Sequence, residues 1–97
     1  MTGSDKSRVV LLTGAAGGLG IVMTTALLEA GHAVVAADRN TAALEKLSAV
    51  AAPHRDRFLP LATDVAIAAQ CEAAVAKTIA HFGRIEGIVN NAGIGPS

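Results

Sequence analysis

The chain has 97 residues, which is enough for one small domain or for part of a larger one, since domains commonly run to roughly 100–150 residues. Eight basic and eight acidic residues cancel without any block of like charge, which argues against nucleic acid or an anionic membrane as a partner. No run resembles a secretory signal or a membrane span, and the lone cysteine, Cys71, fits a reducing compartment. We therefore expect a cytoplasmic protein whose partner is a small molecule or another protein.

The first third of the chain predicts a strand, a helix and a second strand. Residues 8–13 and 33–38 are short apolar runs typical of strands buried on both faces. Between them apolar residues recur at helical spacing, and Gly31 stands where a glycine often ends a helix. The spacing predicts that the helix buries Leu19, Val22, Met23, Ala26, Leu27 and Ala30.

The middle of the chain predicts a second helix over residues 41–52. Asn40 or Thr41 can cap its start, and Pro53 should end it because proline cannot continue a helix. The charged run 55–57 that follows is typical of a solvated loop.

The last part predicts a strand, a helix and a strand. Residues 58–62 form the third strand, and Pro60 favours an edge position because proline cannot donate to a sheet. Residues 66–82 form an alanine-rich helix closed by Gly83, and residues 84–90 form the fourth strand. The third helix should bury Ile67, Cys71, Val75, Ile79 and Phe82.

The order β-α-β-α-β-α-β is typical of an α/β fold with a doubly wound parallel sheet and right-handed crossovers. Ligands of such sheets lie beyond the carboxyl ends of the strands. The unusual residues of this chain fall at those ends.

A glycine-rich run, TGAAGGLG, joins the first strand to the first helix. A helix start offers unpaired N–H groups and a positive potential, so bare backbone at Gly14, Gly18 and Gly20 lets a diphosphate approach the amides. Because Ile21 follows Gly20, the lysine of a P-loop is missing, which argues against nucleoside triphosphate hydrolysis. The alternative is a plain strand-to-helix turn.

Asp38 ends the second strand, where a carboxylate can accept hydrogen bonds from an adenosine ribose and repel a 2′-phosphate. This favours NAD over NADP. The neighbouring Arg39 could instead pair with that phosphate, or be a solvated charge. For Asp38 the alternative is a loop carboxylate or a cap of the second helix.

Two further groups of residues end the third and fourth strands. Asp64 can bond an adenine amino group while Val65 packs on the ring, although Asp64 could equally cap the third helix. The run NNAG, residues 90–93, combines two amides that can tie strand ends together with small residues that let a ligand lie close.

The histidines and the cysteine predict no metal site. His32, His54 and His81 lack metal-ligand spacing, and Cys71 is most simply a small core residue.

Together TGAAGGLG, Asp38, the Asp64-Val65 pair and NNAG resemble the short-chain dehydrogenase/reductase family, and HFGRIEGIVNNAG resembles its usual lead into the fourth strand. The resemblance covers about residues 8–95 and implies a Rossmann-like fold, an NAD(P) cofactor, hydride transfer with an alcohol or carbonyl substrate, and a dimer or tetramer. It implies that Gly14, Gly18, Leu19 and Gly20 line the diphosphate, Asp38 and Arg39 meet the adenosine ribose, Asp64 and Val65 meet adenine, and Asn90, Asn91, Ala92 and Gly93 border the nicotinamide-side ribose.

Two departures from the family stand out. Ala66 replaces a frequent hydroxyl residue, and the sequence contains no tyrosine, so the family's serine and tyrosine-x-x-x-lysine are missing. We therefore expect residues 1–7 to be a flexible tail and residues 8–97 an incomplete NAD(P)-binding half-domain, truncated after the fourth strand and without catalytic residues of its own. The alternative function is a non-catalytic dinucleotide-binding or interaction module.

Overall fold

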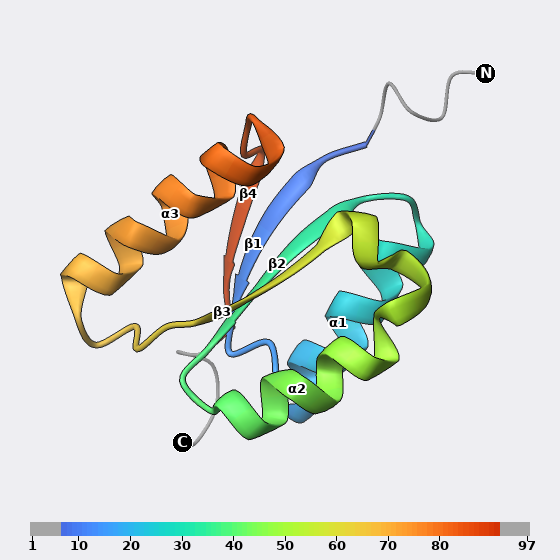
Figure 1. Cartoon of the computed structure of the whole chain (residues 1–97), viewed down its shortest axis with the longest axis horizontal. Coiled ribbons are helices and arrows are strands. Elements are labelled where there is room, and N and C mark those ends of the chain that lie inside the picture. Colours follow the sequence, from blue (N-terminus) through green and yellow to red (C-terminus); the bar gives the residue numbers. More distant parts are fainter. Residues whose placement is uncertain (1–6, 92–97) are drawn as a thin grey trace.

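The computed structural model describes residues 7–91, and the helices and strands follow the predicted order (Figure 1). The strands are parallel and lie in the order β3-β2-β1-β4. The elements are β1 Val9–Thr13, α1 Gly18–Glu29, β2 Ala33–Asp38, α2 Thr41–Val50, the 3₁₀ helix η2 Ala52–Arg57, β3 Phe58–Ala62, α3 Ala68–Phe82 and β4 Gly87–Asn90.

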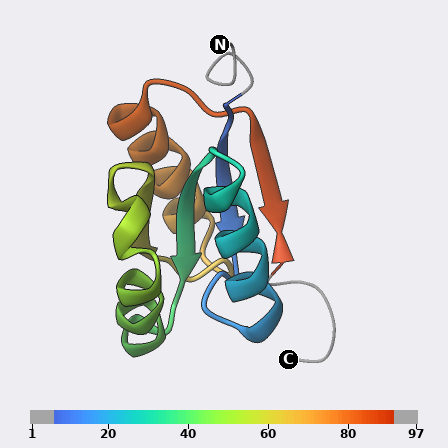
Figure 2. The same ribbon diagram turned by 90° about the vertical axis from the view of Figure 1, so that its right-hand side faces the viewer.

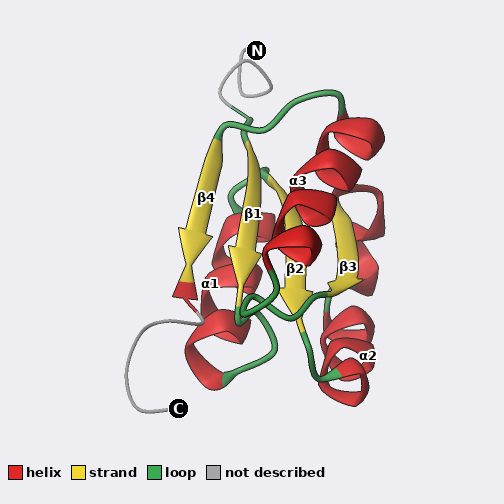
Figure 3. Ribbon diagram, turned by 90° about the vertical axis from the view of Figure 1, so that its left-hand side faces the viewer, coloured by secondary structure: helices red, strands yellow, loops and turns green. Residues whose placement is uncertain are grey.

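The register of the sheet brings all four carboxyl ends to one edge (Figure 3). Thr13, the last residue of β1, pairs with Ala37 of β2 and with Asn90 of β4. Asp38 pairs with Ala62 at the end of β3. The edge position predicted for β3 from Pro60 is confirmed.

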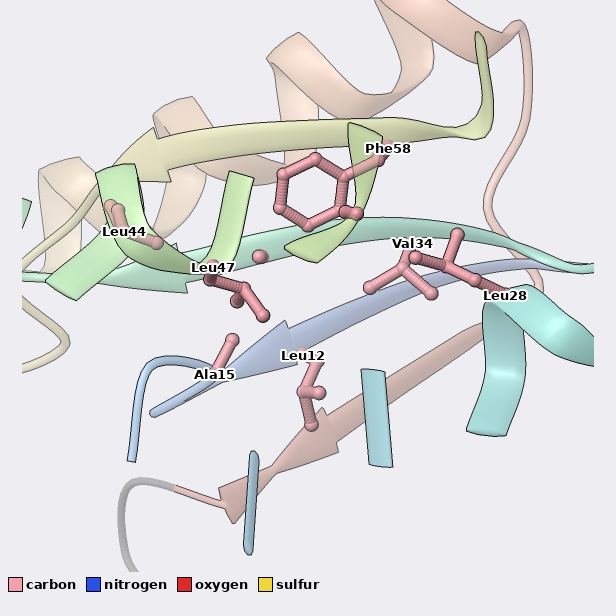
Figure 4. Packing of buried hydrophobic residues seen from close by; sticks show 9 residues of the cluster. Leu12, Ala15, Leu28, Val34, Leu44, Leu47 and Phe58 are labelled. Atoms are coloured by element: carbon pink, nitrogen blue, oxygen red, sulfur yellow. The ribbon is translucent and has the colours of Figure 1, made fainter. Parts of the chain in front are cut away.

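The sheet lies between two helical layers, as expected of a doubly wound fold: α1 and α2 cover one face and α3 covers the other (Figures 2 and 3). Neighbouring residues of a strand point to opposite faces, so β1 and β2 supply both cores. Towards α1 and α2 the buried cluster comprises Leu12, Ala15, Leu28, Val34, Ala36, Leu44, Leu47, Ala51 and Phe58 (Figure 4). Towards α3 it comprises Leu11, Val35, Ala37 and Ala74.

The predicted inward face of α1 was right only in part: Met23 and Leu27 pack against the first of these clusters, but the other predicted residues are exposed. The helix buries Gly20, Thr24 and Leu28, whereas Leu19 and Val22 are 55% and 64% exposed. The physical reason is the close approach of Gly20 to the preceding loop, which turns the small side chains of the helix inward. The end of α1 agrees with the prediction: Gly31 has a φ of 97°, and the amides of Gly31 and His32 bond to the last turn.

The second helix begins as predicted and ends earlier. The Asn40 side chain accepts a hydrogen bond from the Ala43 amide at 3.0 Å and so caps α2. The helix stops at Val50, and the chain continues as η2, which holds Pro53 in its first turn. Proline is tolerated there because the first amides of a helix have no partner within it.

The run 55–57 is solvated at Arg55 and Asp56, as predicted, but it is not a loop, and Arg57 is half-buried. It belongs to η2, and the half-buried Arg57 donates to the carbonyl oxygens of Leu28 at 2.9 Å and His32 at 2.7 Å. The same guanidinium lies 2.9 Å from Nδ1 of His54. Arg57 therefore joins η2 to the end of α1.

The third helix begins later than predicted, and its predicted inward face was right only in part, at Val75 and Phe82. Its side chains are buried at Ala74 and Thr78, while Ile67, just before the helix, and Ile79 are each 45% exposed. Small residues let the helix lie close to the sheet, with Val75 and Phe82 packed at the margin of the cluster. The fourth strand begins three residues later than predicted, at Gly87.

The tail predicted for residues 1–7 lies outside the described residues except for Ser7. The Ser7 hydroxyl donates to the Gly31 carbonyl oxygen at 3.1 Å.

Candidate functional site

The glycine loop between β1 and α1 lies at the carboxyl edge of the sheet. Gly14 has a φ of 66°, a conformation that favours glycine, and so turns the chain directly after β1. Its carbonyl oxygen accepts from the Gly17 amide at 3.2 Å and from the Asn91 side chain at 3.1 Å. The loop is therefore held from within and from the end of β4.

Two glycines of the loop and helix meet different surroundings. A Cβ at Gly18 would have no heavy atom within 4 Å, so this position faces open space. A Cβ at Gly20 would collide with the Gly14 carbonyl oxygen and lie 2.7 Å from backbone atoms of Ala15. Gly20 is thus needed for packing, while bare backbone at Gly18 leaves room for a ligand.

The N-terminus of α1 is suited to an anion. Gly17 is the N-cap residue and provides no side-chain hydrogen bond, and the first turn contains no acidic residue. The first amides of an α-helix have no acceptor within the helix and carry the positive end of its dipole. Leu19, in this first turn, is exposed, so the helix start is accessible from solvent.

Asp38 contacts the glycine loop directly. One carboxylate oxygen accepts from the Ala16 amide at 3.1 Å, and the other accepts from the Asn40 amide at 2.9 Å. Asp38 does not cap α2, because Asn40 does so. Arg39 is exposed beside it.

The end of β4 is tied to the end of β1, as the amides of NNAG indicated. The Thr13 hydroxyl donates to Oδ1 of Asn90 at 2.9 Å, and Asn91 bonds to Gly14. Ala92 and Gly93, the other predicted residues of this run, lie outside the described residues.

Asp64 forms a turn of its own after β3. Its carboxylate accepts from the Ala66 amide at 3.0 Å, and its carbonyl oxygen accepts from Ile67 at 3.0 Å. The N-cap of α3 is Ile67, so the alternative prediction that Asp64 caps the third helix was wrong. This turn also delays α3 until Ala68.

Val65 lies beside a hollow of about 310 Å³ between α3 and the carboxyl ends of β1, β2 and β4. Cys71, predicted as a core residue, is half-buried and lines this hollow, with its thiol 3.4 Å from the Val65 carbonyl oxygen. The hollow is mainly apolar, and it is lined by Leu11, Thr13, Ala37, Thr63, Val65, Cys71, Ala74, Val75, Ile88 and Asn90.

Within residues 7–91, no group of three or more histidine, cysteine, aspartate and glutamate side chains is placed to hold a metal ion. In the same part of the chain, the helices are too short or too polar to cross a bilayer.

The contact of Ala16 with Asp38 was not predicted from the sequence, and the contact of Asn91 with Gly14 was predicted only as a tie between strand ends. Ala16 donates through its backbone, so its residue type carries no signal. The signal that could have located both contacts is the parallel register, which sets the ends of β1, β2 and β4 side by side.

Comparison with known proteins agrees with this geometry. The family model described as short chain dehydrogenase matches residues 8–97, and the chain belongs to this family. D-threitol dehydrogenase of Mycolicibacterium smegmatis is 39% identical over 87 residues, which are 90% of this chain and 34% of the relative.

Solved structures of the family share the fold. A short-chain dehydrogenase/reductase of Brucella melitensis superposes with a TM-score of 0.83 at 29% identity, covering 92% of this chain and 37% of that one. The 3-ketoacyl-(acyl-carrier-protein) reductase of the same organism, solved with NADH, gives a TM-score of 0.75 at 32% identity. The match covers 84% of this chain and 32% of that one. The chain thus spans about a third of the length of the proteins it matches.

Proposed function

We propose that the chain forms the dinucleotide-binding part of an oxidoreductase that transfers hydride between a nicotinamide cofactor and an alcohol or carbonyl substrate. The observation that carries the proposal is the start of α1, which has no side-chain cap, meets open space at Gly18 and lies at the same sheet edge as the Asp38 carboxylate. These residues suit a dinucleotide, because the helix start attracts a diphosphate and the carboxylate can accept ribose hydroxyl groups.

Each predicted site residue then has a role in binding the cofactor, which supplies the hydride chemistry when it is bound. The helix start and loop meet the diphosphate, the end of β2 meets the adenosine ribose, the turn after β3 meets adenine, and the end of β4 borders the nicotinamide-side ribose. In that order the residues are Gly14, Gly18, Leu19 and Gly20; Asp38 and Arg39; Asp64 and Val65; and Asn90, Asn91, Ala92 and Gly93.

We propose NAD rather than NADP as the cofactor. A 2′-phosphate beside Asp38 would bring two negative charges together, whereas ribose hydroxyl groups can donate to the carboxylate. The relative of known structure that was solved with NADH supports this choice. We further propose a small-molecule substrate, a homo-oligomeric complete protein and a cytoplasmic location.

A second candidate function is a non-catalytic interaction module, which the edge strand β4 favours. In the part of the chain that the structure describes, β4 pairs with β1 alone, and Ile88 is 58% exposed. An open strand edge can pair with another chain. This candidate predicts self-association or partner binding without any affinity for NADH.

The test is NADH binding by the purified protein, followed by nicotinamide fluorescence, with Gly18→Val as the variant. A valine side chain would enter the open space at the helix start and raise the Kd by roughly tenfold or more, about 1.4 kcal/mol, with little change in Tm. Gly87→Ala is the matched control, because its Cβ would meet only the Val10 side chain at 4.0 Å. Absence of NADH binding by the unmodified protein would overturn the proposal.

A further inference from the structure

We propose that Asp38 is a positioning residue for the glycine loop in addition to the ribose ligand assigned to it above. This inference rests on the proposed function, because the loop matters through the diphosphate that it is proposed to bind. Asp38 then controls the affinity for the diphosphate as well as the choice between NAD and NADP.

Two neighbouring amides of the loop bond to the end of β2. The Ala15 amide donates to the carbonyl oxygen of Ala37 at 3.3 Å, and the Ala16 amide donates to the Asp38 carboxylate at 3.1 Å. The first contact joins two backbone groups, so it does not depend on the side chain at position 37 as long as the strand keeps its conformation. The second depends on the side chain at position 38.

The same carboxylate fixes the chain that leads into α2. Its other oxygen accepts from the Asn40 amide at 2.9 Å, directly before the helix begins. Asp38 therefore joins the glycine loop to the β2–α2 turn through two separate oxygens. No neutral side chain of similar shape reproduces this arrangement, because asparagine has one carbonyl oxygen and would direct its NH₂ group at the second amide.

The carboxylate still has acceptor capacity for a ligand. Its two oxygens offer about four lone-pair sites, and the two backbone amides use two of them. A ribose diol can donate to the remainder without displacing the loop. Binding of the ribose and holding of the loop are thus compatible in one group, which explains why a carboxylate is suited to this position.

Asp64 shows that this link is specific to Asp38. Its carboxylate also accepts a hydrogen bond from a backbone amide, but the donor is Ala66, two residues further along the same turn. Asp64 therefore stabilises its own turn, whereas Asp38 joins residues 22 positions apart in the sequence.

The experiment separates the two roles by removing the ribose hydroxyl groups from the ligand. ADP and 2′,3′-dideoxy-ADP are titrated into the unmodified protein and into Asp38→Ala and Asp38→Asn by calorimetry, with Asp56→Asn as the matched control on an exposed carboxylate. If Asp38 holds the loop, both Asp38 variants weaken binding of the dideoxy ligand by roughly fivefold or more. The control variant should bind both ligands as the unmodified protein does.

A loss confined to ADP would overturn the inference, because Asp38 would then act on the ribose alone. A ligand-free measurement gives a second test: exchange of the Ala16 amide with solvent, followed by NMR, should be roughly tenfold faster in folded Asp38→Asn or Asp38→Ala. Unchanged exchange in both variants would also overturn it. Failure of the unmodified protein to bind either ligand would instead overturn the proposed function, while the exchange measurement would still decide the role of Asp38 in the loop.

Discussion

The two ends of the sheet use polar side chains in different ways. At the amino end Glu86 accepts from the Val9 amide at 2.6 Å, and Arg57 donates to two carbonyl oxygens near the end of α1. At the carboxyl end Asp38 and Asn91 hold the glycine loop, yet the start of α1 has no side-chain cap. Side chains at the amino end thus bond to backbone groups at the start of β1 and near the end of α1, whereas the carboxyl end leaves the start of α1 without a side-chain cap, where we propose that a ligand binds.

This difference separates residues that stabilise the fold from residues that we propose to bind the cofactor. Helix ends leave the same number of backbone groups without partners, whichever end of the sheet they occupy. Arg57 donates a hydrogen bond to a carbonyl group at the end of α1, whereas no side chain caps the start of α1. Changes at the amino end should therefore affect stability alone, and changes at the carboxyl end should affect binding unless they disturb packing.

Gly20 should show the largest effect. It lies at the carboxyl end of the sheet but is needed for packing, so a change there should affect stability. Gly20→Ala would drive a methyl group into the backbone of Gly14 and Ala15, so we expect a loss of about 3 kcal/mol in the free energy of unfolding. Urea denaturation followed by circular dichroism measures it. Gly18→Ala, two residues earlier, is the control and should unfold at nearly the same urea concentration as the unmodified protein. Equal stability of the two variants would contradict the distinction drawn between these glycines.

Arg57 tests the amino end. Arg57→Met keeps most of the aliphatic side chain but removes the donors to the Leu28 and His32 carbonyl oxygens, so we expect a loss of about 2 kcal/mol in the free energy of unfolding. NADH affinity should not change, since Arg57 and the glycine loop lie at opposite ends of the strands. The control is Arg55→Met, an exposed arginine of the same 3₁₀ helix. A loss of NADH binding in folded Arg57→Met would contradict the claim that residues at the amino end affect stability alone.

The sequence predicted the fold well because its strong signals come from large residues and from turn residues. The β-branched residues of β1 and β2 and the proline of β3 restrict the backbone, whereas Gly31 permits the positive φ at which α1 ends. Alternation of strands and helices then restricts the topology to a parallel sheet. The carboxyl edge as the place of the site followed from that topology and from the glycine loop.

The details that the sequence did not predict depend on small residues and on backbone groups. In α1 the inward positions include Gly20 and Thr24, which carry little hydropathy, so the periodicity favoured the exposed Leu19 and Val22. The partner of Asp38 is an amide that every residue except proline possesses. Arg57 looked like a surface charge because its acceptors belong to the ends of other elements.

Glu86 gives the smallest effect and the one that depends on pH. The hydrogen bond from the Val9 amide, followed by the Arg84 guanidinium at 2.8 Å, holds the pKa of Glu86 below its ordinary value of 4.5, against an opposing effect of desolvation. Because the folded-state pKa is lowered, the charge stabilises the fold above the unfolded-state pKa, and this contribution disappears as the pH falls through the folded-state pKa.

Glu86→Gln keeps an oxygen that can accept from the Val9 amide but removes the charge that faces Arg84. The Tm of the unmodified protein should therefore exceed that of Glu86→Gln at pH 7, and the gap should close as the pH is lowered below 4.5. Glu45→Gln, on the exposed side of α2, should show no gap that varies with pH. A Tm difference that stays constant between pH 7 and pH 3 would mean that the shape of the Glu86 side chain, rather than its charge, holds the start of β1. The ion pair of Glu86 with Arg84 would then contribute nothing to the stability of the amino end.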